Sequence, residues 1–130
     1  MGCRAVICDK DTTKENANTK IGIYVHWYGD EKSIERLLAV CKERKMRGVI
    51  NDPQYGWARA CQAFGDVMTQ DNMESGFETA KNNAYNTGLG IGIVSQLDCR
   101  NYDNGVYYID DEYNIVKHTS GAELEGGDDE

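Results

Sequence analysis

Several features that would point to a specialised class of protein are scarce in this sequence. Its 130 residues include one proline, two histidines and two phenylalanines. No apolar run approaches the roughly 20 residues that a membrane-spanning helix needs. The N-terminus lacks the basic and then apolar layout of a secretory signal. We therefore expect a cytoplasmic protein that makes no membrane contact.

The cysteines also lack the pattern of a disulfide scaffold or a zinc site. They are odd in number and form no Cys-x-x-Cys pair, at positions Cys3, Cys8, Cys41, Cys61 and Cys99. In a reducing compartment they are most simply reduced, small core side chains. Neither the cysteines and histidines nor the aspartates near 98–112 have the spacing of a zinc or calcium site. We expect no metal and no cofactor.

The net charge of −8 is spread unevenly along the chain. Five acidic residues fall within 123–130, beside the Gly126-Gly127 pair, which is typical of a disordered, solubilising tail. We predict a single domain over 1–120 and an acidic disordered tail over 121–130. The rest of the chain is only mildly acidic, which argues against direct nucleic-acid binding, because that binding needs clustered Lys and Arg to displace counterions.

Residue periodicity predicts an α+β fold. Apolar alternation indicates strands at 3–9, 21–29, 88–94, 106–109 and 113–117. Helical spacing indicates helices over 31–47, with Asp30 as N-cap and Gly48 as the stop, and from 53 onward, with Asp52 as N-cap. Residues 69–88 fit a weak helix within an insertion. The expected architecture is a largely antiparallel sheet of about five strands, in the order strand, strand, helix, helix, weak helix, then three strands, with the helices on one face.

The segment 21–29 has two chemically different faces if it is extended. Ile21, Ile23, Val25 and Trp27 alternate with polar or aromatic residues, so we expect the first set in the core. The other face would present two phenols and an imidazole to solvent or a ligand. Tyrosine is abundant here, with eight in the chain, and its large and partly polar ring suits interfaces. The candidate binding residues are Tyr24, His26, Tyr28, Tyr107 and Tyr108.

Two chemical interpretations of these residues stay open beside simple protein binding. His26 could pair with Cys3 or Cys8 on the neighbouring strand as a thiolate–imidazolium couple, although no third orienting group or oxyanion hole is evident. The Gly-x-Gly-x-Gly run at 88–92 is not the dinucleotide-binding fingerprint, and it predicts a strand with one bare face that an aromatic ring or another backbone could approach. We assign no catalytic residue.

Four short motifs resemble a group of small, largely uncharacterised phage and prophage proteins. These proteins begin with a Met-x-x-Arg-[Ala/Ser] strand and carry an Ile-Tyr-x-His-Trp-x-Gly-like segment, which residues 1–7 and 23–29 resemble. The Tyr-Gly-Trp-Ala-Arg run at 55–59 and the Asp-Asn-Gly-Val-Tyr run at 103–107 also look like the group. The likeness covers 1–60 and 88–117, whereas 66–87 looks like an insertion. It implies a mobile-element origin and transfers no catalytic residue.

Phage proteins of this size often bind host machinery stoichiometrically, so the leading hypothesis is a non-enzymatic inhibitor of a bacterial defence effector. CRISPR–Cas is one candidate target, which would make the protein an anti-CRISPR. A nucleotide-signal sponge and a small Cys/His-dependent enzyme are the alternatives, and a homodimer is also considered. The expected partner is a host protein in the host cytoplasm.

Overall fold

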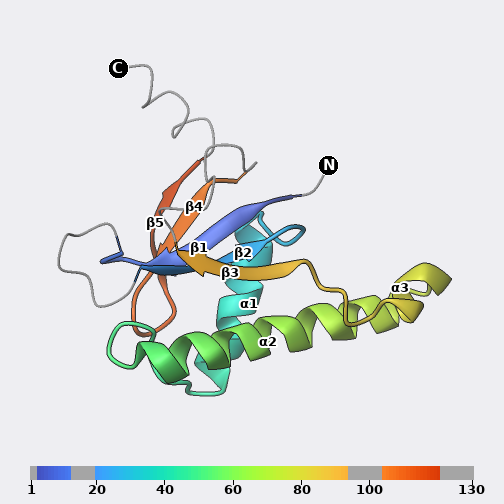
Figure 1. The fold of residues 1–130 in the computed structure, drawn as a ribbon, viewed down its shortest axis with the longest axis horizontal. Helices are drawn as coiled ribbons and strands as arrows, with labels where there is room; N and C mark the ends of the chain where they lie inside the picture. The colour runs from blue at the N-terminus through green and yellow to red at the C-terminus, as the bar shows by residue number, and fades with distance from the viewer. Residues whose placement is uncertain (1–2, 13–19, 94–103, 121–130) are drawn as a thin grey trace.

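The computed structural model of the chain describes residues 3–12, 20–93 and 104–120. The predicted acidic tail and Cys99 lie outside these residues. The elements follow the order predicted from the sequence (Figure 1). They are β1 (Ala5–Asp9), β2 (Ile21–Val25), α1 (Glu31–Glu43), α2 (Pro53–Glu74), α3 (Glu78–Asn82), β3 (Leu89–Ile93), β4 (Val106–Ile109) and β5 (Ile115–Thr119).

The five strands form one mixed sheet in the order β3-β2-β1-β4-β5. Three of the four pairings are antiparallel, as expected for a largely antiparallel sheet, and β1 pairs with β4 in parallel. The central strand β1 is buried along its whole length. The fold is therefore α+β, as predicted.

One face of the sheet is covered by α1 and α2 (Figure 1). The core between them contains apolar residues from both layers, and its largest side chains are Trp57, Tyr107, Tyr113 and Phe64. In α1, the buried residues are Ile34, Leu37, Leu38 and Cys41, which is the stripe that helical spacing predicts. Among the described residues, no helix has both the length and the apolar character needed to cross a membrane.

The start of α1 agrees with the sequence prediction, but its end does not. The Asp30 carboxylate accepts a hydrogen bond from the backbone N–H of Ser33, as an N-cap should. The helix ends at Glu43, four residues before the predicted end. Lys45 has a φ of 52°, and the Met46 N–H donates to the Cys41 carbonyl. The Lys45 N–H also donates to the Lys42 carbonyl. Together these two bonds form a Schellman motif with lysine in the left-handed position where glycine is usual, so the prediction of Gly48 as the stop was wrong.

The second strand is shorter than predicted. Ile23 and Val25 are fully buried, which confirms the assigned core face as far as residue 25. The chain then bends at 26–27, and Trp27 is 53% exposed, so its placement in the core was wrong. Beyond the bend, the Gly29 N–H donates to the Cys3 carbonyl at 2.8 Å. A Cβ at residue 29 would lie 2.5 Å from that carbonyl oxygen, so only glycine fits at this position.

Candidate functional site

Tyr24 and His26 form a polar pair at the end of β2. The Tyr24 hydroxyl lies 2.5 Å from Nδ1 of His26, and both side chains are partly exposed. The imidazole also makes an edge contact with the Trp27 indole, with 4.7 Å between ring centroids. These two predicted site residues therefore lie together, beside an exposed indole that the sequence had placed in the core.

His26 does not form the predicted couple with a cysteine, because its imidazole is paired with Tyr24. Its Nδ1 faces a phenol, while Cys8 is fully buried in the central strand. Cys3 instead accepts a hydrogen bond from the Asn104 amide, at 3.1 Å from its sulfur. The Tyr24 ring lies over the bare face of β3, where a Cβ added at Gly90 would be 3.5 Å from it, which is an ordinary van der Waals distance. An aromatic ring therefore lies beside this glycine, but the contact does not require glycine.

Tyr107 does not belong to an exposed surface, so that part of the prediction was wrong. It pairs with Ile7 on the helix-covered face of the sheet and is fully buried. Its hydroxyl donates to the Gly29 carbonyl at 2.7 Å, and its ring stacks on His118 with 4.0 Å between centroids. Burial, followed by nearby acidic side chains, raises its pKa to about 12. Tyr108, its neighbour on the opposite face, is partly exposed beside Lys117.

Tyr28 lies apart from the Tyr24–His26 pair and has a bracing role. Its hydroxyl donates to Asp71 on α2 at 2.7 Å, and Arg36 on α1 makes two further bonds of 2.7 Å to the same carboxylate. Hydrogen bonding to Arg36 lowers the pKa of Asp71 below its ordinary value. Burial and the bond to Asp71 raise the pKa of Tyr28 to about 12. At neutral pH the network therefore holds a charged pair and a neutral phenol.

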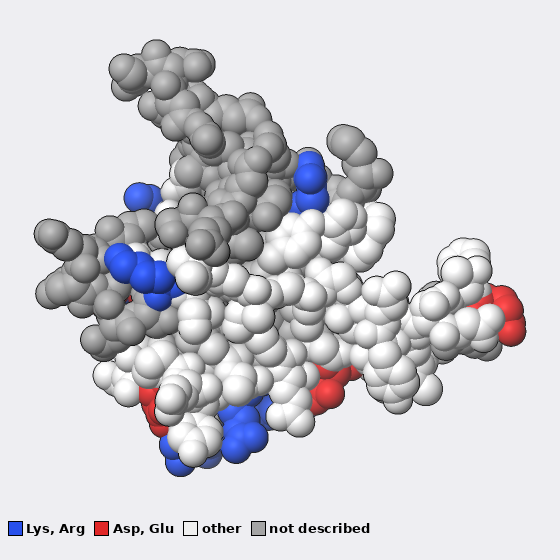
Figure 2. All heavy atoms as spheres, in the orientation of Figure 1, with Lys and Arg blue, Asp and Glu red and all other residues white. Residues whose placement is uncertain are grey.

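Beyond this brace, the chain forms a projecting segment that we call the arm, residues 72–87. It comprises the last turn of α2, the short α3 and the return to β3, and it extends away from the sheet (Figure 1). Its large aromatic side chains are accessible, since Phe77 is 75% exposed and Tyr85 is 84% exposed. Met73 is also exposed, and acidic side chains lie on the arm (Figure 2). The arm is thus an apolar projection with acidic neighbours.

A hydrogen bond joins the end of α2 to the segment after α3, near the base of the arm. The side-chain amide of Asn72 donates to the Ala84 carbonyl at 3.1 Å, and Ala84 is buried. At the far end, Gly76 has a φ of 84°, and the Phe77 N–H donates to the Ser75 hydroxyl. The exposed side chains are therefore presented by a hydrogen-bonded framework. A partner would find much of this segment already ordered.

The sequence predicts a weak helix in this insertion, but it does not predict which side chains of the arm are exposed. Met73 and Phe77 are four residues apart, which is also the spacing of a buried helical stripe. The signal that separates the two interpretations is Gly76, together with the asparagines at 82, 83 and 86, because such residues weaken a helix. They indicate that the second helix ends before Phe77.

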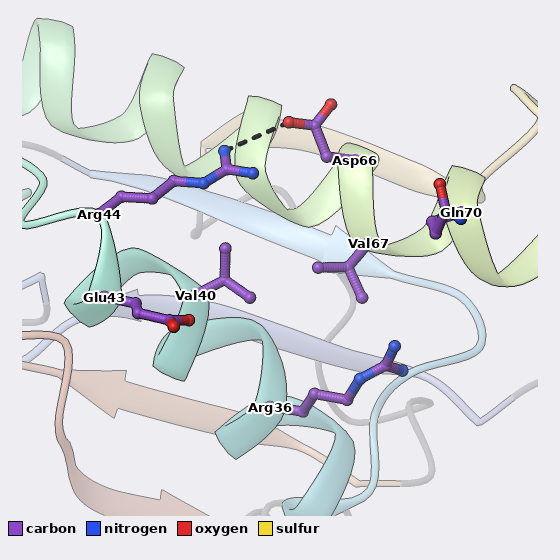
Figure 3. Close-up of a pocket in the computed structure, with 7 residues that line it drawn as sticks. All are labelled: Arg36, Val40, Glu43, Arg44, Asp66, Val67 and Gln70. Carbon is purple, nitrogen blue, oxygen red and sulfur yellow. Dashed lines mark hydrogen bonds and ion pairs between the residues drawn. The ribbon is translucent and has the colours of Figure 1, made fainter.

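A shallow groove runs between α1 and α2 on the outer side of the helix layer (Figure 3). It encloses about 550 Å³, and its residues are Arg36, Val40, Glu43, Arg44, Asp66, Val67 and Gln70. The two valines form an apolar floor. Arg44 is paired with Asp66 at 3.2 Å, and Arg36 is held by Asp71. Both arginines of the groove are therefore already ion-paired.

The described residues contain no group of three or more His, Cys, Asp or Glu side chains arranged to hold a metal ion. No family model, curated protein or solved structure matches this chain.

Proposed function

We propose that this protein binds and inhibits a bacterial defence effector stoichiometrically, with CRISPR–Cas nucleases as one candidate class. The observation that carries the proposal is the arm, which exposes Phe77, Tyr85 and Met73 on a braced projection. The resemblance of residues 1–60 and 88–117 to phage and prophage proteins supports a role against host machinery. The protein would act in the host cytoplasm.

The exposed arm residues are of the type that dominates binding energy at protein interfaces. Aromatic side chains that fill a partner's pocket are frequent hot spots, and burying each one removes a large apolar area from water. Monomeric proteins seldom expose large apolar side chains in one cluster without an interaction to cover them. We therefore place Phe77 and Tyr85 at the centre of the interface.

The charge around these residues indicates what the partner looks like. Glu74 and Glu78 flank the exposed phenylalanine, and the whole chain carries a net charge of −8. A complementary partner has an apolar pocket bordered by Lys and Arg, as on a protein that itself binds nucleic acid. Complementary charge accelerates association of the two proteins. Salt screens the charges, so association should be slower at high ionic strength.

The test is a pulldown and calorimetric titration against a panel of purified defence effectors, followed by a target-cleavage assay. Phe77→Ala and Tyr85→Ala should each weaken binding by about tenfold or more and relieve inhibition in proportion. The matched control is Tyr55→Ala, because Tyr55 is an exposed tyrosine at the opposite end of α2. It should leave binding unchanged.

Two results would contradict the proposal. One is a panel in which the wild-type protein neither binds nor inhibits any effector. The other is equal loss of binding in the Tyr55 control and the arm variants, which would indicate a general surface effect. Unchanged melting temperatures of all three variants would show that the differences arise at the interface.

A second candidate function is the binding of a nucleotide signal beside β2, favoured by the exposed Trp27 indole next to the Tyr24–His26 pair. An exposed indole can stack on a base, and the imidazole and phenol can exchange hydrogen bonds with it. Cyclic nucleotides should then raise the melting temperature of the wild-type protein. Trp27→Ala should abolish the increase, and no shift with any nucleotide would remove this candidate.

A further inference from the structure

The two edges of the sheet are protected to very different degrees. At the β5 edge, the pairing with β4 skips Val116 as a bulge, and Lys117 lies over the Tyr108 ring. Bulges and lysines are the usual means by which edge strands avoid pairing with other chains. The β3 edge has the sequence Leu-Gly-Ile-Gly-Ile, which contains no charge and no proline, and its pairing with β2 is regular.

The β3 edge is also apolar at its surface. Ile91 is 58% exposed and Ile93 is nearly half exposed, although both lie on the helix side of the sheet. Figure 2 shows an uncharged surface over β3, with charged side chains located around it. An unprotected edge with exposed aliphatic side chains is a template for another strand.

The register identifies which backbone groups of β3 face outward. The His26 N–H donates to the Gly88 carbonyl, so the backbone carbonyl of residue 88 points toward the β2 chain. Hydrogen-bonded positions alternate along an antiparallel ladder. The backbone N–H and C=O groups of Gly90 and Gly92 therefore also point toward β2. The N–H and C=O groups of Leu89, Ile91 and Ile93 therefore point away from the sheet. They have no hydrogen-bond partner within the described residues.

The sequence of β3 is complementary to a second copy of itself. In an antiparallel pair centred on Ile91, each Leu89 faces an Ile93 and each Gly90 faces a Gly92. The three outward-pointing residues then become the hydrogen-bonded positions, which gives about six new backbone bonds. All aliphatic side chains then fall on one face of the pair and all glycines on the other. A two-fold axis between the two Ile91 residues relates the two strands.

We propose that β3 pairs with β3 of a second copy of this chain, joining the two sheets into one continuous sheet. The pairing would cover the exposed part of Ile91 with the partner's Ile91, and the exposed part of Ile93 with the partner's Leu89. A five-residue strand pair buries less area than a standard protein interface, so the dimer is reversible and depends on concentration. The inference is independent of the arm and of any defence effector.

The first test measures the mass of the full-length protein by sedimentation equilibrium over roughly a hundredfold range of concentration. The wild-type protein should shift from monomer to dimer. Ile91→Lys should weaken dimerisation by at least about tenfold, because two lysines would face each other at the two-fold axis. The matched control is Val116→Lys at the β5 edge, where the native valine is also about half exposed; it should dimerise like the wild type.

The second test resolves the register by amide hydrogen exchange. In the dimer, the amides of 89, 91 and 93 should be protected at high protein concentration and exchange quickly on dilution. Those of Gly90 and Gly92 should stay protected throughout, because they are bonded to β2. Circular dichroism and melting of dilute Ile91→Lys confirm that this variant is folded.

Three results would overturn the proposal. A wild-type protein that stays monomeric at the highest concentration has no such dimer. A dimer that Ile91→Lys leaves intact uses another surface. Protection of residues 89, 91 and 93 in a monomer would show that another segment of the same chain occupies this edge. None of these results affects the pulldown that tests the arm.

Discussion

At the scale of single residues, two non-glycine residues in the described part of the chain have left-handed backbone, and side-chain packing holds only one of them there. Lys45 has a φ of 52° at the end of α1, and Tyr113 has a φ of 63° at the turn before β5. Tyr113 is held there because its side chain is buried and its hydroxyl donates to the Arg47 carbonyl at 2.5 Å. Lys45 is exposed and has no such anchor. The strain at Lys45 is therefore open to relief by substitution.

We predict that Lys45→Gly stabilises the protein by about 1 kcal/mol, because glycine adopts the left-handed conformation without the steric cost of a Cβ. The control is Lys42→Gly, inside the last turn of α1, which should cost about 1 kcal/mol. Urea unfolding of both variants measures the difference. A loss of stability in Lys45→Gly would mean that the lysine side chain contributes more than its backbone costs.

At the scale of elements, α2 contains two glycines whose surroundings differ. Gly56 is buried, and a Cβ added there would lie 2.5 Å from the Gly48 carbonyl oxygen. This close approach packs the first turns of α2 against the loop that follows α1. At Gly65, the nearest atom to an added Cβ is the Leu89 Cδ1, at an ordinary contact distance of 3.7 Å. Only the first glycine is required by packing.

The same substitution should therefore have opposite effects at the two positions. Gly65→Ala should stabilise the protein by about 0.5–1 kcal/mol through helix propensity. Gly56→Ala gains the same propensity, but displacement of the 48–49 backbone should outweigh it and give a net loss of about 1–3 kcal/mol. Thermal unfolding of both variants checks the prediction. Equal effects at both sites would contradict the assigned packing.

At the scale of the whole molecule, one carboxylate joins three elements at the root of the arm. Asp71 on α2 accepts bonds from Arg36 on α1 and from Tyr28 in the segment after β2. Its pKa is lowered chiefly by Arg36, so its ionised form is favoured in the folded state. The stabilisation is present above the unfolded pKa of about 4 and is lost as the pH falls through the lower folded value.

Asp71→Asn should therefore loosen the arm at neutral pH and have no further effect in acid. We expect faster hydrogen exchange of amides 72–87 in the variant than in the wild type at pH 7. The difference should shrink as the pH falls below about 4, because protonation removes the same charge from the wild-type protein. A difference that persists unchanged in acid would show that the brace depends on shape and not on charge.

Much of the fold was predictable because it depends on local signals. Alternation placed β1, β3 and β4 within two residues, and Asp30 together with the Asp52-Pro53 pair marked the starts of both long helices. The stripe of α1 and the buried Trp57, Phe64 and Met68 of α2 followed from helical spacing. These features involve residues close in sequence, so local patterns are enough to predict them.

The sequence by itself determined the order of the elements, the helix starts and the α+β class. Tertiary structure alone decided that β1 and β4 are parallel, that Tyr107 faces inward, and that Trp27 and the arm are exposed. Alternation shows that two faces differ without showing which one the helices cover, and helical spacing does not show where a helix extends beyond its sheet. The face that the helices cover and the point where a helix extends beyond the sheet both depend on contacts between residues far apart in the chain. The surfaces left exposed to partners depend on the same contacts.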